Sequence, residues 1–209
     1  LGDVYKRQIS VGEDGATHQC NEDIALMRTI PNMVIINPAD DVEARAAVKA
    51  AYEHVGPVYL RFGRLAAPVI NDNPEYKFEL GKGVTLREGK DITIVATGLE
   101  VSFALEAAQM LEKDGIDARV INIHTIKPID EEIIVKAAKE TKKIFTVEEH
   151  SIIGGLGSAV CDVVCEKQPA PVYKIGMRDR FGESGPAMEL LHKYELDAEG
   201  IYNQIKANM

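Results

Sequence analysis

The segment DITIVATGLEVSFALEAAQMLEKDGIDARVINI, residues 91–123, decides the fold class. It opens with a short apolar run at 91–97, which is typical of a buried strand. Residues 100–113 then place apolar side chains on one stripe at helical spacing, and Gly115 ends the predicted helix. A second apolar run at 118–123 predicts another strand. Strand, helix and strand in this order indicate a βαβ unit with parallel strands.

The same alternation continues toward residue 209. Further strands are predicted at 82–86, 143–147 and 171–175. Further helices are predicted at about 130–141, 157–167 and from 185 onward. Strands that alternate with helices of this length predict a doubly wound α/β domain, which we assign to residues 82–209.

A shorter unit precedes this domain. A short helix is predicted at 21–29, followed by a strand at 33–36, a helix at 41–54 and a strand at 58–62. This is another βαβ unit, but it is too short for a complete domain, so we interpret residues 9–65 as the C-terminal part of one. Residues 66–81 carry Pro, Asn and Asp without a clear period and are predicted to be a linker.

Composition narrows the possible functions. The chain has 209 residues and a formal net charge of −9, which argues against a nucleic-acid partner because phosphate binding depends on Lys and Arg. Its three cysteines are sparse and odd in number, which favours reduced thiols. No stretch approaches the roughly 20 apolar residues of a membrane span, and no signal segment opens the sequence. We therefore predict a cytoplasmic protein with no membrane partner.

The first residues have an unusual feature. The sequence begins with Leu1, and one back-translation of residues 3–8 is GATGTGTATAAGAGACAG, which resembles an adapter end used in DNA library preparation. We interpret residues 1–8 as a non-native leader. A native polar segment is the alternative, and the nucleotide sequence would distinguish the two.

The loop GEDGATHQ at residues 12–19 is the most informative polar segment. Loops at the ends of strands in α/β proteins commonly bind ligands. The carboxylate of Asp14 can accept a hydrogen bond from a substrate hydroxyl, and His18 can bind a hydroxyl or move a proton near neutral pH. The residue types alone also fit an ordinary turn with a structural histidine, so they leave both interpretations open.

This loop, followed by LMRTIPN at 26–32 and NPAD at 37–40, resembles the transketolase family. The resemblance runs from Ile9 to near the C-terminus. It implies an α/β fold in which the end of a pyrimidine-binding middle domain (a partial βαβ unit, 9–65) precedes a transketolase C-terminal domain (82–209). It also implies either an N-terminally truncated transketolase or the C-terminal subunit of a split one.

The resemblance implies roles for three residues. Asp14 matches the residue that binds the hydroxyls of the ketose donor, and His18 matches the histidine that contacts the sugar near its reacting carbons, as a substrate-binding and catalytic residue. Arg64 matches the phosphate-binding arginine, a role that suits the planar guanidinium fork. Arg61 is a nearby competitor for that match, and a plain surface salt bridge is the other interpretation of Arg64.

The remaining polar and sulfur residues are interpreted without catalytic roles, as is the Gly-rich turn at 154–157. Those assigned a structural or rim position are His124, His150, Asp179 and Glu183. His54 and His192 are expected to be solvated, and Cys161 and Cys165 to pack on one helix face.

The family's anchor for the cofactor is missing from this sequence. Transketolases bind thiamine diphosphate and Mg²⁺ through a G-D-G…N motif in an N-terminal domain, and no such motif occurs here in that context. The resemblance therefore implies no metal ligand and no known cofactor residue in this chain, which is expected to be inactive alone. The partner would be an N-terminal subunit or region, in a homodimer or heterotetramer that acts on sugar phosphates.

Three functions remain open. The first is transfer of a two-carbon ketol unit between sugar phosphates. The second is a deoxyxylulose-phosphate synthase or a 2-oxoacid dehydrogenase β-type subunit, against which the Thr17-His18-Gln19 run argues. The third is a non-catalytic assembly subunit, in which substitution of Asp14 or Arg64 would leave the activity of the complex intact.

Overall fold

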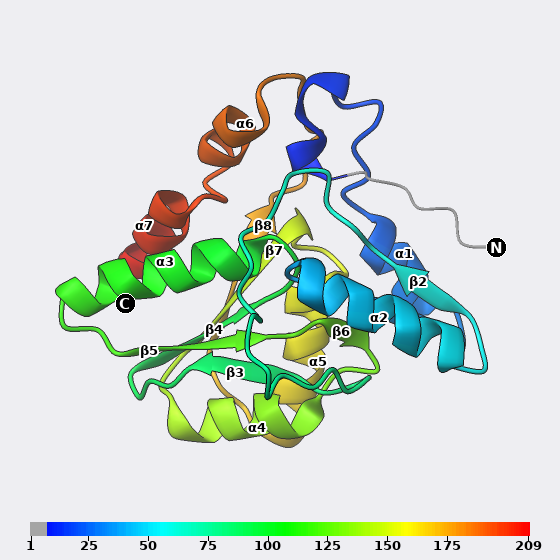
Figure 1. Ribbon diagram of the computed structural model, residues 1–209. Coiled ribbons are helices and arrows are strands. Elements are labelled where there is room, and N and C mark those ends of the chain that lie inside the picture. The colour runs from blue at the N-terminus through cyan, green and yellow to red at the C-terminus, as the bar shows by residue number, and fades with distance from the viewer. Residues whose placement is uncertain (1–7) are drawn as a thin grey trace.

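The computed structural model describes residues 8–209 (Figure 1). The leader predicted at 1–8 thus lies outside the described residues except for Gln8, which is buried. The first segment contains the 3-10 helix η1 (Ile9–Asp14), α1 (Asp23–Thr29), β1 (Val34–Ile36), α2 (Asp41–Glu53) and β2 (Val58–Leu60). The C-terminal domain contains β3 (Val84–Arg87), β4 (Ile92–Ala96), α3 (Glu100–Lys113), β5 (Ala118–Asn122), β6 (Thr125–Lys127), α4 (Glu131–Glu140), β7 (Ile144–Ser151), α5 (Leu156–Lys167), β8 (Val172–Met177), α6 (Ala187–Lys193) and α7 (Ala198–Ala207).

A five-stranded sheet forms the centre of the C-terminal domain, in the order β3-β5-β4-β7-β8. Its strands are parallel except for the edge strand β3, which runs antiparallel to β5. Helices α3 and α7 cover one face, and α4 and α5 cover the other (Figure 1). Adjacent residues of β4 show the alternation: Ile94 packs in the cluster of α3 and α7, and Val95 packs in the cluster of α4 and α5. This arrangement confirms the predicted doubly wound α/β domain.

A smaller sheet joins the two parts of the chain. Its order is β2-β1-β6, with β1 parallel to β2 and antiparallel to β6. The predicted βαβ unit of the first segment is therefore present, but β6 was not predicted, and it belongs by sequence to the C-terminal domain. Lys127, the last residue of β6, also donates hydrogen bonds from Nζ to the carbonyl oxygens of Arg28 (2.9 Å) and Ile30 (2.6 Å). The C-terminal domain thus supplies a strand to the first segment.

Residues 66–81 contain no helix or strand, and hydrogen bonds fasten them to α2. Asp40 caps α2 by accepting from the N–H of Glu43, and its other carboxylate oxygen accepts from the N–H groups of Ile70 and Asn71 at 2.7 Å each. The buried carboxylate of Glu43 accepts from the hydroxyl of Tyr76 at 2.6 Å. The connection between the two parts is therefore held against the N-terminal end of α2 by these hydrogen bonds.

The loop interpretation of residues 12–19 is wrong at its start, because residues 12–14 belong to η1 (Ile9–Asp14). The physical reason is burial: Ile9 packs in the same cluster as Leu190 and Leu191 of α6. The helix is distorted at Gly12, whose φ of +73° is not helical.

None of the helices described here has the length and apolar character needed to cross a membrane.

Candidate functional site

Two of the three predicted site residues meet in the structure. Asp14 ends η1, and Arg64 follows β2. Nη1 of Arg64 forms an ion pair with Oδ2 of Asp14 and also donates to the carbonyl oxygen of Val11 at 3.4 Å. The side chain of Arg64 is 49% exposed and that of Asp14 is 43% exposed, so both charges face solvent and are open to a ligand.

His18 lies four residues beyond Asp14 on the same loop. Its N–H donates to the carbonyl oxygen of Gly15 at 2.9 Å, and its Nδ1 lies 3.1 Å from the hydroxyl of Thr17. The side chain is exposed, and neither Asp14 nor Arg64 is among its hydrogen-bond partners. Thr17 contacts Nδ1, and no hydrogen bond of the other ring nitrogen, Nε2, is found among the described residues.

Arg61, the competitor of Arg64, is enclosed in the protein. Its side chain is 2% exposed, and it donates from Nε and Nη2 to the two carboxylate oxygens of Asp23 at 2.8 and 3.1 Å. Burial alone would raise the pKa of Asp23, but the Arg61 guanidinium, together with His150 and the Tyr59 hydroxyl, outweighs it and holds that pKa below its usual value. Arg61 is thus committed to a buried ion pair, and Arg64 is the arginine that remains accessible.

Three consecutive ionisable residues near the carboxyl end of β7 lie beside the ion pair of Arg61 and Asp23. Glu148, Glu149 and His150 are buried. Burial raises the pKa of Glu148 to about 7 and of Glu149 to about 6, and lowers the pKa of His150 to about 4. The sequence prediction gave no role to the two glutamates. The signal was available, because three ionisable residues directly follow the apolar run at 144–147.

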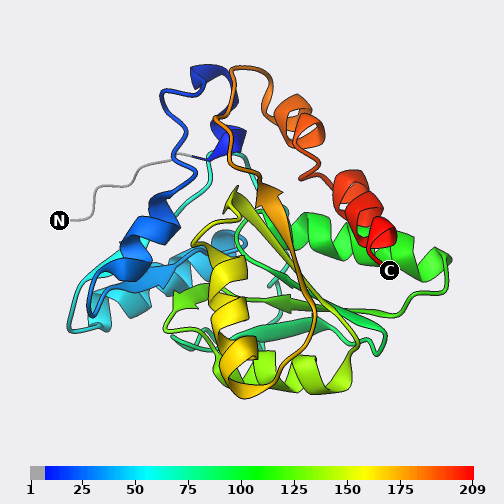
Figure 2. The same ribbon diagram turned by 180° about the vertical axis from the view of Figure 1, so that it is seen from behind.

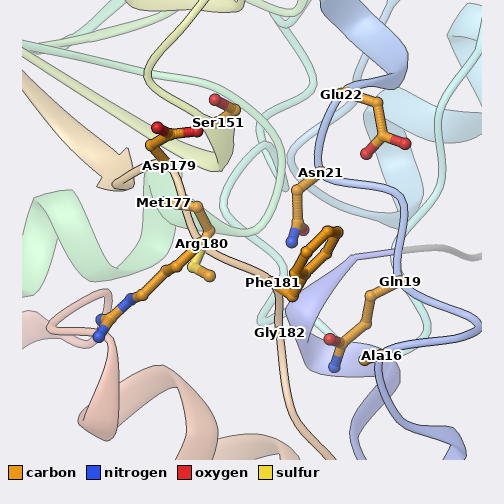
Figure 3. A pocket seen from close by; sticks show the side chains of 10 residues that line it. All are labelled: Ala16, Gln19, Asn21, Glu22, Ser151, Met177, Asp179, Arg180, Phe181 and Gly182. Atoms are coloured by element: carbon orange, nitrogen blue, oxygen red, sulfur yellow. The ribbon is translucent and has the colours of Figure 1, made fainter.

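Two pockets border the loop. The larger, of about 400 Å³, lies between Gln19 and Asn21 of the first segment and residues 177–182 of the C-terminal domain, with the ring of Phe181 beside Asn21 (Figure 3). The smaller, of about 240 Å³, is lined by Arg64 together with residues 10–13 of η1. The larger pocket is not lined by Asp14, His18 or Arg64. The smaller pocket is lined by Arg64 but not by Asp14 or His18, so Arg64 is the predicted residue that offers a charged group there.

No group of three or more His, Cys, Asp or Glu side chains among residues 8–209 could hold a metal ion.

Two family models together match most of the sequence. Residues 4–69 match the transketolase pyrimidine binding domain, and residues 81–201 match the transketolase C-terminal domain. The chain belongs to the transketolase family.

Known transketolases extend beyond the matched region. The chain is 49% identical over 203 residues to a putative transketolase C-terminal section of Methanocaldococcus jannaschii, covering 96% of this chain and 63% of the relative. It is 45% identical to a 6-deoxy-6-sulfo-D-fructose transketolase subunit of Clostridium sp. (strain MSTE9), covering 90% of this chain and 58% of the relative. The chain thus spans about three-fifths of the length of these curated relatives.

Solved transketolases share the fold. A structure described as a split gene transketolase, inactive beta4 tetramer, superposes with a TM-score of 0.88 at 51% identity, covering 92% of this chain and 63% of that one. A 1-deoxy-D-xylulose-5-phosphate synthase of Heliobacterium modesticaldum is 40% identical over 91% of this chain, which covers 30% of that enzyme. The fold is therefore that of a transketolase C-terminal portion, and the sequence similarity extends to a 1-deoxy-D-xylulose-5-phosphate synthase.

Proposed function

We propose that this chain serves as the C-terminal part of a transketolase that transfers a two-carbon ketol unit between sugar phosphates. The observation that carries the proposal is the accessible ion pair of Asp14 and Arg64. Asp14 lies on the loop that contains Thr17-His18-Gln19, and Arg64 lines a pocket. A carboxylate and a guanidinium side by side suit a ligand that carries both hydroxyl groups and a phosphate.

The roles follow from the chemistry of the side chains. Arg64 binds the phosphate of the sugar through its guanidinium fork. Asp14 accepts hydrogen bonds from the sugar hydroxyls, and it is released from Arg64 when phosphate takes its place. His18 donates to, or accepts from, a sugar hydroxyl at Nε2 and moves a proton there, while Thr17 holds Nδ1.

The nucleophilic carbon of this chemistry is supplied by thiamine diphosphate when it is bound. The sequence lacks the family's G-D-G…N motif for the Mg²⁺ and the diphosphate, so we assign their binding to another polypeptide region. An N-terminal transketolase subunit or region is the proposed source, in a homodimer or a heterotetramer. The split-gene relative supports this arrangement. The chain alone is therefore inactive.

A ketol-transfer assay on a reconstituted enzyme tests the proposal. The chain, extended to a complete pyrimidine-binding domain, is combined with an N-terminal transketolase subunit, thiamine diphosphate, Mg²⁺, a ketose phosphate and ribose 5-phosphate. We expect turnover only with both polypeptides, and a large loss with Asp14→Ala. Asp41→Ala is the matched control, because Asp41 is an exposed carboxylate that also pairs with an arginine, Arg45, but on α2.

The other outcomes separate the alternatives. Turnover with pyruvate as donor, and none with ketose phosphates, would favour the synthase or dehydrogenase reaction that the similarity to the Heliobacterium enzyme keeps open. Full activity in Asp14→Ala and in an Arg64 variant would favour a non-catalytic assembly subunit.

A further inference from the structure

The loop that carries Asp14 and His18 is hydrogen-bonded to the C-terminal domain at both ends of the loop. We call residues 9–19 the substrate loop. At its start, the N–H and the hydroxyl of Ser10 both donate to the carboxylate of Glu149, the hydroxyl at 3.2 Å. At its end, Nε2 of Gln19 donates to the carbonyl oxygens of Ile9 (3.3 Å) and Glu183 (3.0 Å). The ends of the loop are thus tied to each other and to the C-terminal domain.

The backbone of the substrate loop also lies directly on this domain. At Gly15, where φ is +78°, a Cβ atom would come within 2.1 Å of the Ser184 hydroxyl. At Gly12, where φ is +73°, it would come within 3.1 Å of the carbonyl oxygen of Gly185. Both views of the ribbon show η1 beside the segment that leads into α6 (Figures 1 and 2). The backbone of the loop therefore packs closely against residues 184 and 185 of the C-terminal domain.

Glu149 also contacts Arg61, which lies just before Arg64 in the chain. Its carbonyl oxygen accepts from Nη2 of Arg61 at 3.0 Å, and Arg61 is fixed in turn by Asp23. Arg61 precedes Arg64 by three residues. One buried residue of β7 thus contacts the strand end that leads to Arg64 and, through its side chain, the loop that leads to Asp14.

We infer that Glu149 is a positioning residue for ketol transfer. Its carboxylate sets the place of Asp14 through Ser10, and its backbone carbonyl contacts Arg61, which precedes Arg64. This gives the C-terminal domain a part in substrate binding, and it rests on the proposed roles of Asp14 and Arg64. The contacts themselves do not depend on those roles. The anchoring can therefore be tested without activity.

The first measurement is amide hydrogen exchange on the chain. We expect Glu149→Ala to raise the exchange rates of residues 11–18 by roughly tenfold or more, because both hydrogen bonds from Ser10 to the carboxylate are lost. Glu149→Gln, which keeps the shape and one acceptor oxygen, should recover most of the protection. Glu148→Ala is the matched control. It is the adjacent buried glutamate, but its carboxylate accepts from the N–H groups of Leu156 and Gly157 at the start of α5. Its effect should not be confined to the loop.

The second measurement is the steady-state kinetics of the reconstituted enzyme. We expect Glu149→Ala to raise KM for the ketose phosphate by roughly tenfold or more. Glu149→Gln should recover it, and Glu148→Ala should leave it close to wild type. A merely structural role would instead lower the active fraction, and with it kcat, equally in the Glu148 and Glu149 variants.

Several results would overturn the inference. One is unchanged exchange in residues 11–18 of Glu149→Ala, and another is a rise spread evenly over the chain. If Glu149→Ala does not fold, Glu149→Met fills similar space without an oxygen acceptor, and wild-type exchange of residues 11–18 in that variant would have the same meaning. Absence of turnover in the wild-type reconstituted enzyme would reject the proposed function, whereas the exchange rates would still decide whether Glu149 anchors the loop.

Discussion

Arg64 and Asp14 are 50 residues apart in the chain and form an ion pair whose two side chains are each about half exposed. Exposed pairs of this kind contribute roughly 0 to 1 kcal/mol to stability, because solvent screens the charges. A phosphate that approaches Arg64 can therefore displace Asp14 at little cost. In the proposed function, the pair separates when a ligand with a phosphate and hydroxyl groups binds.

The first prediction concerns Arg64→Gln in the reconstituted enzyme. Loss of charge-assisted hydrogen bonds of about 1.5 to 3 kcal/mol should raise KM for a phosphorylated ketose by roughly 10- to 100-fold. A ketol donor without phosphate should be affected much less. Steady-state kinetics with both donors measure the difference.

The control for this prediction is Arg45→Gln. Arg45 is also an exposed arginine paired with an aspartate, Asp41, but it lies on α2. Its kinetic constants should match the wild type. Equal effects of Arg64→Gln on both donors would contradict phosphate binding by Arg64.

The second prediction concerns the buried pair of Arg61 and Asp23. Replacing Arg61 by Met should lower the free energy of unfolding by about 3 to 5 kcal/mol, because the carboxylate of Asp23 stays buried without its charged partner. The double variant Asp23→Leu/Arg61→Met should recover much of this loss, because no charge then remains unpaired. Urea denaturation monitored by circular dichroism measures all three proteins.

The exposed pair of Arg45 and Asp41 again provides the comparison. Arg45→Met should change the free energy of unfolding by less than about 1 kcal/mol. Equal effects at Arg45 and Arg61 would show that burial does not distinguish the two pairs.

Patterns that repeat within one element were predictable from the sequence. The helix at 100–113 has the predicted bounds, because its apolar stripe repeats over 14 residues and a glycine follows it. The strand β6 has three residues and an unremarkable composition, and its partner β1 lies about 90 residues earlier in the chain. Its pairing depends on how the first segment packs against the C-terminal domain, and a local sequence pattern does not predict this packing.

The candidate site was also predictable only in part from the sequence. Asp14, His18 and Arg64 were chosen from a motif, and the structure brings Asp14 and Arg64 together. The difference between Arg61 and Arg64 could not be predicted, because it depends on where Asp23 and Glu149 lie once the chain has folded. Two arginines three residues apart have similar local sequences, yet one is enclosed and the other is open.

The third prediction concerns the connection at 66–81. Lys77 is exposed in a segment without helix or strand, so limited digestion with trypsin should cut there. The two pieces should remain associated under native conditions. They share the sheet of β1 and β6 and the hydrogen bonds from Ser10 and Arg61 to Glu149.

Size-exclusion chromatography of the digested protein measures this association. The pieces should elute together in buffer and separately in denaturant. Separate elution in buffer would mean that the first segment and the C-terminal domain fold as independent units.

The fourth prediction concerns the pH dependence of stability and His124. This histidine is buried, its Nδ1 lies 2.9 Å from the hydroxyl of Thr125, and its ring lies 4.3 Å from that of Phe78 between centroids. Burial lowers its pKa from 6.5 to about 4, although the charge of Asp130 opposes the change. The folded protein therefore holds His124 neutral at pH values where the unfolded chain would protonate it.

The sign of the effect follows from proton binding. Between about pH 6.5 and pH 4 the unfolded state binds more protons at this residue, so acidification favours unfolding by up to about 1.4 kcal/mol per pH unit. The contribution of His124 to stability is complete above its unfolded pKa and is lost as the pH falls through this window. His124→Phe, which keeps a ring against Phe78, should remove that part of the slope.

The measurement is the free energy of unfolding of the wild type and of His124→Phe at several pH values. His150 has a pKa of about 4 as well, and Glu148 and Glu149 have raised values, but all three are present in both proteins and cancel in the difference. His192→Gln is the control with opposite sign, because its hydrogen bond to Asp197 raises the pKa of this exposed histidine. A difference between wild type and His124→Phe that does not change between about pH 7 and pH 4.5 would show that His124 titrates alike in the folded and unfolded states.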